Sequence, residues 1–279
     1  MITDLIELPE PSREAGFPIL GKAEYQNPTG SIKDRPIGRI LSRALESGIL
    51  RPGMWVVEAT TGNTGIGLAH LARQHGLRAV IFKNPGQAEE KARRMREMGA
   101  RVFEVASPPG GPDQKTLEAH RFVDRMKGMA WYCDQFNNPH NPEAHWDTAR
   151  EIWSQRPDVA GFVSGAGTGG TLLGIQQWCR QHRPLVQIGY VIAHTTADRP
   201  TIAEGTGRTI PSQIREQIRP DHEWWLSDSE FRRWMRPLSV GPSAAMNVEA
   251  AIRMARIIRQ PVATVLCDGL ERYPDLITE

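Results

Sequence analysis

Cysteine is scarce in this chain of 279 residues: three are present, and they lie far apart in the sequence, at Cys133, Cys179 and Cys267. Their number is odd and no Cys-x-x-Cys pair occurs, so the sequence predicts no disulfide framework. Isolated thiols of this kind are typical of a reducing compartment. We therefore expect three reduced cysteines and a cytoplasmic protein.

Long apolar runs and an excess of one charge are also absent. No segment of 18 apolar residues occurs, and the first five residues do not begin a targeting signal. The 34 basic and 32 acidic residues are interspersed and give a formal net charge of +2. This balance argues against a nucleic-acid partner, and the lack of apolar runs argues against a membrane partner.

Short apolar runs alternate with amphipathic stretches, and Gly, Asn or Pro marks each junction. This rhythm predicts βαβ units, largely parallel sheets and two α/β lobes. A connector rich in Pro and Asn, residues 137–142, predicts a boundary between the lobes. The predicted strands are 55–59, 79–82, 101–105, 159–164, 186–192 and 263–267. The predicted helices are 65–75, 88–98, 114–126, 144–155, 171–180 and 249–259, with residues 193–211 predicted as a long loop.

The stretch Asn-Pro-Thr-Gly-Ser-Ile-Lys-Asp-Arg, residues 27–35, places a lysine at a predicted helix start. Ser31 is a suitable N-cap and Asp34 follows three residues later, so we expect Lys33 in the first helical turn. The positive end of the helix dipole disfavours an ammonium group there, and burial would lower the lysine pKa further. A neutral amine is what Schiff-base chemistry with an aldehyde cofactor requires. The alternative is a solvated surface lysine.

Two predicted strand-to-helix junctions are rich in glycine. Residues 60–65, Thr-Thr-Gly-Asn-Thr-Gly, offer hydroxyl and backbone N–H groups that suit a carboxylate, although a tight turn alone also needs glycine. Residues 165–171, Gly-Ala-Gly-Thr-Gly-Gly-Thr, leave N–H groups free to bind a phosphate. This second loop fits the dinucleotide pattern GxGxxG, but the next predicted strand leads to His194 without the acidic residue of such sites. One phosphate is the better interpretation, and no GxxxxGK[ST] sequence is present.

A lysine able to form an imine, a phosphate loop and a carboxylate loop together describe a pyridoxal 5′-phosphate enzyme. The successive motifs NPTGSIKDR, TTGNTGIGLA, DQFNNPHNP, GAGTGGT, GPSAAMN and CDGLERY resemble those of the cysteine synthase and cystathionine β-synthase family, in order from Thr3 to Tyr273. DQFNNPHNP and CDGLERY are most similar to the cysteine synthase B branch. The resemblance implies the two-lobed α/β fold type II, with a smaller mobile lobe at 27–138 that binds the substrate carboxylate. Residues 1–26 and 139–279 would form the larger lobe, which binds the cofactor phosphate.

The resemblance also implies roles for individual residues. Lys33 would hold the cofactor as an internal aldimine and act as general acid and base, and Asn63 would bind the pyridine 3′-oxygen. Ser243 would face the pyridine nitrogen, with Asp268 as a rival for that place, and Gly205 would lie at the pocket mouth. The phosphate cradle would comprise Gly167, Thr168, Gly169, Gly170 and Thr171. The substrate carboxylate would be bound by Thr60, Thr61, Gly62, Thr64 and Gln135.

The implied reaction is β-replacement on an activated L-serine, O-acetylserine or O-phosphoserine, through an α-aminoacrylate. Sulfide or another small nucleophile would then add, giving L-cysteine or a related β-substituted alanine. Three alternatives stay open: β-elimination or dehydration, a catalytically silent homologue that binds another protein, and a nicotinamide-dependent oxidoreductase built on GAGTGG. The family also implies a homodimer.

Some residues depart from the family pattern. Thr61 stands where serine is usual, and Pro36 in the lysine helix is expected to shift or bend its start. Arg208 follows the Gly205-Thr206-Gly207 loop and Arg199 precedes it, which fits either an anionic donor or two solvated arginines. We expect no metal site, because the histidines of the HNPEAH sequence (140–145) are five residues apart with a proline between them.

Overall fold

A computed structural model of the chain describes residues 2–107, 113–195, 201–206 and 211–277. It divides into two compact units: unit 1 comprises Met1–Ile32 and Asn141–Glu279, and unit 2 comprises Lys33–His140. The sequence analysis placed the boundaries at residues 27 and 139. Residues 27–32 lie in unit 1 because this segment is bonded to it, for instance through the Ile32 N–H, which donates to the Cys267 carbonyl at 2.9 Å.

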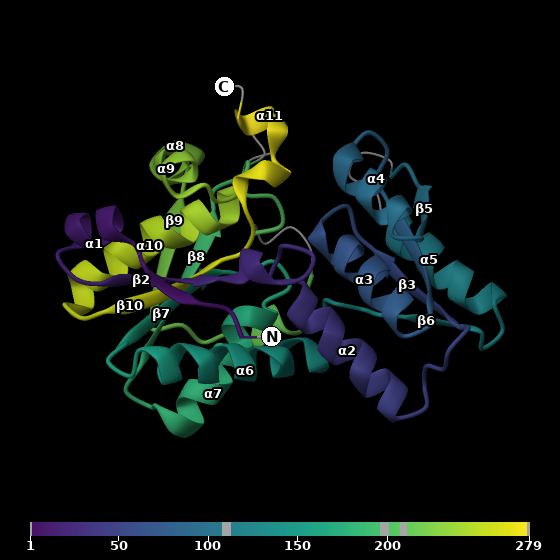
Figure 1. Cartoon of the computed structure of the whole chain (residues 1–279), viewed down its shortest axis with the longest axis horizontal. Coiled ribbons are helices and arrows are strands. Elements are labelled where there is room, and N and C mark those ends of the chain that lie inside the picture. Colours follow the sequence, from purple (N-terminus) through teal and green to yellow (C-terminus); the bar gives the residue numbers. More distant parts are fainter. Residues whose placement is uncertain (1, 108–112, 196–200, 207–210, 278–279) are drawn as a thin grey trace. The chain divides into compact units, whose positions relative to one another are not determined.

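Unit 1 contains a six-stranded sheet in the order β1-β2-β10-β7-β8-β9 (Figure 1). The pair β1 and β2 is antiparallel, and every other neighbouring pair is parallel. The strands are β1 Leu5–Glu7, β2 Ile19–Ala23, β7 Gly161–Gly165, β8 Gln187–Ala193, β9 His222–Leu226 and β10 Val262–Leu266.

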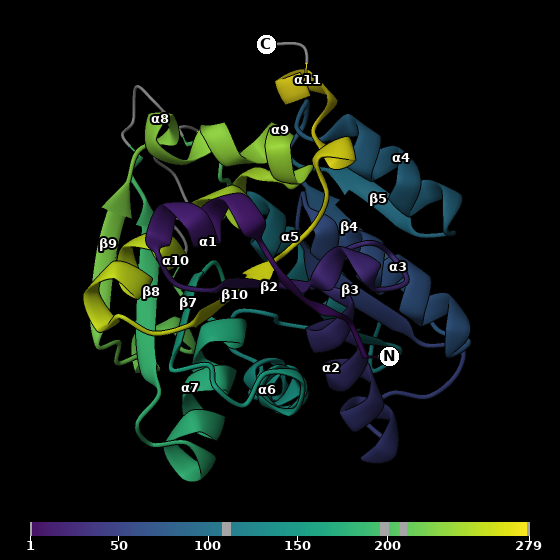
Figure 2. The same ribbon diagram turned by 60° about the vertical axis from the view of Figure 1, so that its left-hand side comes forward.

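Helices cover both faces of this sheet, as Figure 2 shows, with α1 and α10 on one face and α6 and α7 on the other. Successive strand residues supply the two cores in turn, because side chains alternate across a strand. Phe162 packs with α6 and α7, whereas Val163 packs with α10. The helices of unit 1 are α1 Pro9–Ala15, α6 His140–Gln155, α7 Gly170–His182, α8 Asp228–Phe231, α9 Met235–Leu238, α10 Pro242–Ile258 and α11 Pro274–Ile277. The short 3₁₀ turns are η1 Glu24–Gln26, η2 Arg215–Gln217, η3 Arg232–Trp234 and η4 Leu270–Arg272.

Unit 2 contains a four-stranded parallel sheet in the order β5-β4-β3-β6. Helices α2, α3 and α4 contribute to the core on one face, and α5 contributes to the core on the other. The strands are β3 Trp55–Ala59, β4 Arg78–Lys83, β5 Arg101–Glu104 and β6 Ala130–Tyr132. The helices are α2 Asp34–Glu46, α3 Asn63–Gln74, α4 Glu89–Glu97 and α5 Gln114–Arg125. The predicted α/β class with mostly parallel sheets is confirmed.

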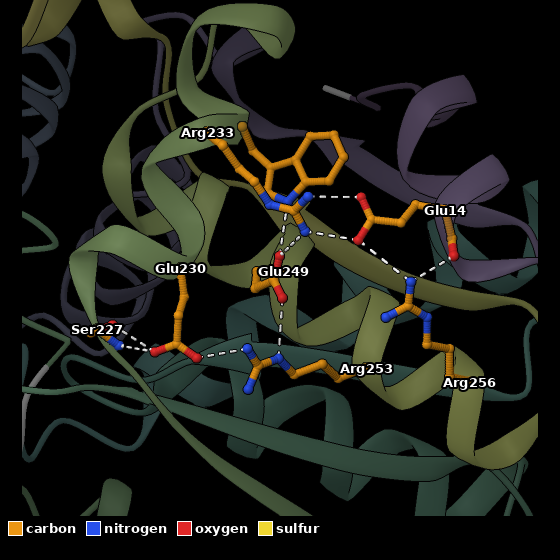
Figure 3. A network of polar contacts seen from close by, with 8 residues as sticks. Glu14, Ser227, Glu230, Arg233, Glu249, Arg253 and Arg256 are labelled. Atoms are coloured by element: carbon orange, nitrogen blue, oxygen red, sulfur yellow. Dashed lines mark hydrogen bonds and ion pairs between the residues drawn. The ribbon is translucent and has the colours of Figure 1, made fainter.

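A polar network around a buried carboxylate joins three elements of unit 1 on the α10 side of the sheet. Glu249 on α10 accepts bonds from Arg233 Nη2 at 2.7 Å, Trp234 Nε1 at 3.0 Å and Arg253 Nε at 3.1 Å (Figure 3). Arg233 also forms a two-point ion pair with Glu14 on α1. The network therefore links α1, η3 and α10 over the outer surface of the core.

Within the described ranges no helix is both long and apolar enough to cross a membrane. All three cysteines fall in those ranges and are free thiols, with Cys133 and Cys179 buried and Cys267 half-buried.

Candidate active site

The predicted site residues fall in both units, and each group is described within its own unit. Lys33, the 60–64 junction and Gln135 belong to unit 2. The 165–171 loop, Gly205, Ser243 and Asp268 belong to unit 1. Arg199 and Arg208 lie outside the described residues.

The lysine helix begins later than predicted. Ser31 is not its N-cap: α2 starts at Asp34, and Lys33 occupies the position before it. Ser31 instead forms an isolated antiparallel bridge with Asp268, so its backbone is committed before the helix begins. The Lys33 carbonyl accepts the first helical bond, from Ile37 N–H at 3.2 Å. Lys33 is half-buried at the positive end of this helix.

Pro36 is the third residue of α2 and is compatible with a regular start. The first N–H groups of a helix have no partner within it, so a proline there removes no helical bond. The later start of α2 at Asp34 goes with the bridge at Ser31, and Pro36 is not needed to explain it.

A tight turn precedes the lysine. Gly30 N–H donates to the Asn27 carbonyl at 2.7 Å, and Gly30 has a φ of +80°, which favours glycine. The guanidinium of buried Arg272 donates to the Thr29 carbonyl in the same turn. A Cβ on Gly30 would lie 2.5 Å from Arg272 Nη2, so glycine is also required by the close approach of this arginine.

The carboxylate junction connects β3 to α3 in unit 2. Thr60 Oγ1 accepts the Gly62 N–H at 3.2 Å, and α3 begins at Asn63. Thr60 and Thr64 are buried, whereas Thr61, Gly62 and Asn63 are half-buried. The hydroxyl of Thr64 donates to Gln135 Oε1 at 2.7 Å. The fold thus brings Gln135 to this junction from the segment that follows β6.

The same junction adjoins the start of the lysine helix. A Cβ on Gly67 of α3 would lie 3.2 Å from Asp34 Oδ1 and 3.7 Å from the carbonyl carbon of Lys33. Glycine at this position therefore allows α3 to approach the backbone of Lys33 closely. Lys33 and the helix that begins at Asn63 are neighbours within unit 2.

Glu58, which the sequence analysis did not identify, is hydrogen-bonded to the two segments that form this junction. Its fully buried carboxylate accepts the N–H of Ala59 at 2.9 Å and the N–H of Gln135 at 3.1 Å. Burial raises the pKa of Glu58 to about 7, although these two bonds act in the opposite direction. The only signal in the sequence is an acidic residue inside an otherwise apolar strand.

The phosphate loop of unit 1 leads from β7 into α7. Gly169 has a φ of +92°, and Thr168 Oγ1 accepts the Gly170 N–H at 3.3 Å. Asn141 Nδ2 donates to Thr168 Oγ1 at 3.1 Å, and Ser212 Oγ donates to the Thr168 carbonyl at 2.6 Å. Asn141 and Ser212 therefore fix Thr168, at the centre of the loop, from outside it.

The loop has no room for side chains at three of its glycines. A Cβ on Gly167 would lie 2.6 Å from the Gly205 carbonyl oxygen, and one on Gly169 would lie 2.7 Å from the Cα of Arg215. A Cβ on Gly170 would overlap the Asn141 side chain. Because these glycines carry no side chains, the loop can present its backbone N–H groups to an anion at the start of α7, a helix of 13 residues. These residues fit one phosphate group.

A histidine that the sequence analysis weighed only as a metal ligand lies beside this loop. His145 is buried on α6, with Nε2 at 3.3 Å from Thr171 Oγ1 and Nδ1 at 3.2 Å from Thr148 Oγ1. The HNPEAH segment was interpreted as a connector followed by a helix. It instead forms the first turns of α6, and its polar side chains contact the loop.

The two candidates for a ring-nitrogen partner have different surroundings. Ser243 is the second residue of α10 and is half-buried. Asp268 follows β10, is 2% exposed, and accepts the hydroxyl of Tyr273 at 2.8 Å. Burial and this carboxylate raise the pKa of Tyr273, so the phenol remains protonated and continues to donate.

Comparison with known proteins agrees with this arrangement. Residues 2–268 match the family described as "Pyridoxal-phosphate dependent enzyme". Cysteine synthase 1 of Neurospora crassa is 35% identical over 98% of this chain and 80% of its own length. Cysteine synthase B of Pseudomonas aeruginosa is 32% identical, over 97% of this chain and 92% of its own length.

A solved structure extends the likeness to the fold. The O-acetylserine dependent cystathionine β-synthase of Helicobacter pylori superposes with a TM-score of 0.87 and 25% identity, over 98% of this chain and 94% of the other. The match spans both sheets and the loops that carry the lysine and the glycines. The chain therefore belongs to the pyridoxal-phosphate dependent enzyme family and is a cysteine synthase-like member of it.

Proposed function

We propose that the enzyme catalyses β-replacement on an activated L-serine, either O-acetylserine or O-phosphoserine. Sulfide or another small nucleophile is added, and the product is L-cysteine or a related β-substituted alanine. The observation that carries the proposal is the contact in unit 2 between the start of the lysine helix and the helix of the 60–64 junction. Similarity to two cysteine synthases over nearly the whole chain supports it.

In this proposal the cofactor is pyridoxal 5′-phosphate. The backbone N–H groups of Gly167–Thr171 would bind its phosphate, Lys33 would attach it to the protein, and Asn63 would bind its 3′-oxygen. Ser243 would face the ring nitrogen, as the resemblance to the family implies, and Asp268 Oδ2 accepts the Tyr273 hydroxyl. The bound cofactor withdraws electrons from the bonds at the amino-acid α-carbon.

The protein then supplies binding and proton transfer. Thr60, Thr61, Gly62, Thr64 and Gln135 bind the substrate carboxylate with hydroxyl, amide and N–H groups. Lys33 Nζ takes the α-proton of the bound amino acid. Ser243 would offer the ring nitrogen a neutral hydroxyl, which would limit electron withdrawal by the cofactor and favour loss of a β-substituent over transamination.

The test measures product formation by the purified holoenzyme. O-acetylserine or O-phosphoserine is supplied with sulfide, and L-cysteine is quantified. Lys33→Ala should lower the rate by at least about a hundredfold, since general acid and base groups contribute this much or more. Lys91→Ala, which removes a lysine from α4, should leave the rate unchanged. Release of pyruvate and ammonia at the same rate without sulfide would indicate β-elimination, and no consumption of either donor would overturn the proposal.

Assembly and location belong to the same proposal. We propose a homodimer in the cytoplasm, with unit 2, Lys33–His140, as the mobile lobe that closes on the substrate carboxylate. Three free thiols suit a reducing compartment. Sedimentation equilibrium of the holoenzyme measures the mass, and a single species of 31.2 kDa would contradict the dimer.

A further inference from the structure

A buried acidic side chain lies near the end of β3, just before the proposed carboxylate-binding junction. Glu58 is the fourth residue of β3 and is fully buried. Its oxygens have separate tasks: Oε1 accepts the N–H of Ala59 at 2.9 Å, and Oε2 accepts the N–H of Gln135 at 3.1 Å. One carboxylate therefore joins the end of β3 to the turn that follows β6.

That turn holds Gln135 in a constrained position. The preceding residue, Asp134, has a φ of +52°, which is uncommon for a residue with a side chain. Gln135 is bonded at both ends, through its N–H to Glu58 and through Oε1 to the hydroxyl of Thr64. Glu58, Gln135 and Thr64 form one chain of hydrogen bonds that leads from the sheet to the first turn of α3.

We infer that Glu58 is a positioning residue whose ionised carboxylate holds Gln135 and the 60–64 junction in the arrangement that binds the amino-acid carboxylate. The inference rests on the proposed function, because it uses Gln135 and Thr64 as carboxylate contacts. When Glu58 is protonated, one of its acceptor sites becomes a hydroxyl donor. A hydroxyl donor cannot accept a hydrogen bond from a backbone N–H group, so one of the present bonds is weakened. Affinity for the amino acid therefore falls when Glu58 takes up a proton.

The surroundings of Glu58 place this proton uptake near neutral pH. The groups that face it are the Tyr132 hydroxyl, the Cys133 thiol and the Asp134 carboxylate, none of which carries positive charge. Burial raises the pKa of Glu58 to about 7, against the effect of the two N–H donors. Burial and the Glu58 carboxylate also raise the pKa values of Tyr132 and Cys133, so these two groups stay neutral while Glu58 titrates.

The test compares the wild type with Glu58→Gln. Glutamine has the same shape but one acceptor oxygen, so it satisfies one of the two N–H groups. The holoenzyme is titrated with L-alanine, which has no β-leaving group, and Kd is read from the cofactor absorbance between pH 6 and 8.5. For the wild type we expect Kd to rise by up to tenfold per pH unit below pH 7. For Glu58→Gln we expect the Kd at pH 8 to be about tenfold higher than that of the wild type. We expect the Kd of this variant not to rise in the same way below pH 7.

Turnover separates positioning from a role in chemistry. Since Glu58 touches no reacting group, Glu58→Gln should raise KM for the donor about tenfold and change kcat by less than about threefold. The matched control is Glu104→Gln at the carboxyl end of β5, a strand that β4 separates from β3. This change should leave both constants and the pH profile unchanged. Glu104 is paired with Lys83 and makes no contact with Gln135 in the described structure.

The outcomes distinguish this inference from the proposed function. If the wild type binds L-alanine and turns over the donor, but Glu58→Gln gives the same Kd and pH profile, the inference alone is wrong. If the wild type neither binds L-alanine nor consumes a donor, the proposed function is wrong and this inference falls with it. Should the variant fail to fold, the wild-type profile decides, because a Kd that is flat below pH 7 also overturns the inference.

Discussion

The guanidinium of Arg272 donates a hydrogen bond to the carbonyl oxygen of Thr29, four residues before Lys33. Both residues are buried, and the arginine side chain fills the space above Gly30. The end of the chain thus fixes the turn through which the chain approaches its candidate catalytic lysine. The CDGLERY motif that supplies Arg272 appears in the sequence as a similarity to known enzymes, and here it has a structural role.

Replacing Arg272 by lysine should destabilise this turn. The shorter, differently shaped cation cannot reproduce the guanidinium contact, and an unsatisfied buried carbonyl costs about 1–3 kcal/mol. We expect the free energy of unfolding in urea to fall by that amount. Attachment of the cofactor to Lys33, measured after borohydride reduction by mass spectrometry, should also be less complete.

Arg183→Lys is the control for this change. Arg183 also donates to a carbonyl, that of Pro157 at 2.8 Å, but this bond is exposed. Water can replace it, so we expect little effect on stability and none on cofactor attachment. Equal losses of stability and of cofactor attachment in the two variants would contradict a specific role for the bond between Arg272 and Thr29.

Replacing Gly170 by alanine should disrupt the phosphate loop. The added Cβ would overlap the Asn141 side chain, which holds Thr168. Forcing in a methyl group costs about 1–3 kcal/mol, and the loop must shift to accept it. We expect weaker retention of pyridoxal phosphate during dialysis, measured by absorbance, together with lower thermal stability.

Gly38→Ala tests whether any glycine would give this result. Gly38 lies in α2, where a Cβ would meet only Leu71 Cδ1 at 3.9 Å. Alanine favours a helix over glycine by about 1 kcal/mol, so this variant should be slightly more stable and should retain the cofactor. Loss of cofactor in both variants would contradict a specific role for Gly170.

Replacing Glu249 by alanine should lower stability without affecting chemistry. The carboxylate accepts bonds from Arg233, Trp234 and Arg253, and its removal leaves the buried Trp234 N–H without this acceptor. We expect a loss of about 2–4 kcal/mol in urea unfolding and an unchanged kcat. Glu46→Ala removes a fully exposed carboxylate on α2 and should change neither quantity.

Glu58 should also make stability depend on pH. Its pKa is about 7 in the folded protein and 4.5 in the unfolded chain, so the folded state binds more protons between these values. Its contribution to the free energy of unfolding is therefore present below pH 4.5 and is lost as the pH rises through 7, by roughly 3 kcal/mol in all. Urea unfolding at several pH values should show this decline in the wild type and a smaller decline in Glu58→Gln. Parallel curves would contradict the assignment.

Much of the fold could be predicted from the sequence because its elements are locally marked. The strands 55–59 and 263–267 and the helices closed by Gly76 and Gly99 agree with the structure within one or two residues. The helix predicted from Glu249 starts instead at Pro242, a residue that fits the first turn of a helix. β6 and β9 were missed, since β6 has three residues and β9 begins with His-Glu and exposes Trp225.

Only part of the candidate site could be predicted from the sequence. Glycines and hydroxyl residues at strand ends indicate anion loops, because the N–H groups of the following helix are always there. The supports of those loops come from distant segments, as Asn141 does for Thr168 and Glu58 does for Gln135. Such contacts leave no pattern along the chain, and the same holds for the Ser31 bridge that delays the lysine helix.

The pairing of β2 with β10 has a consequence for how the protein is made. β2 precedes unit 2 along the chain, and its parallel partner β10, which pairs Val262 with Ile19, follows unit 2. Unit 2 is one continuous segment whose four strands all precede residue 133. On the ribosome, unit 2 can complete its sheet early, whereas β2 must wait for β10. β1 and β2 therefore join the full sheet of unit 1 only after unit 2 has been synthesised.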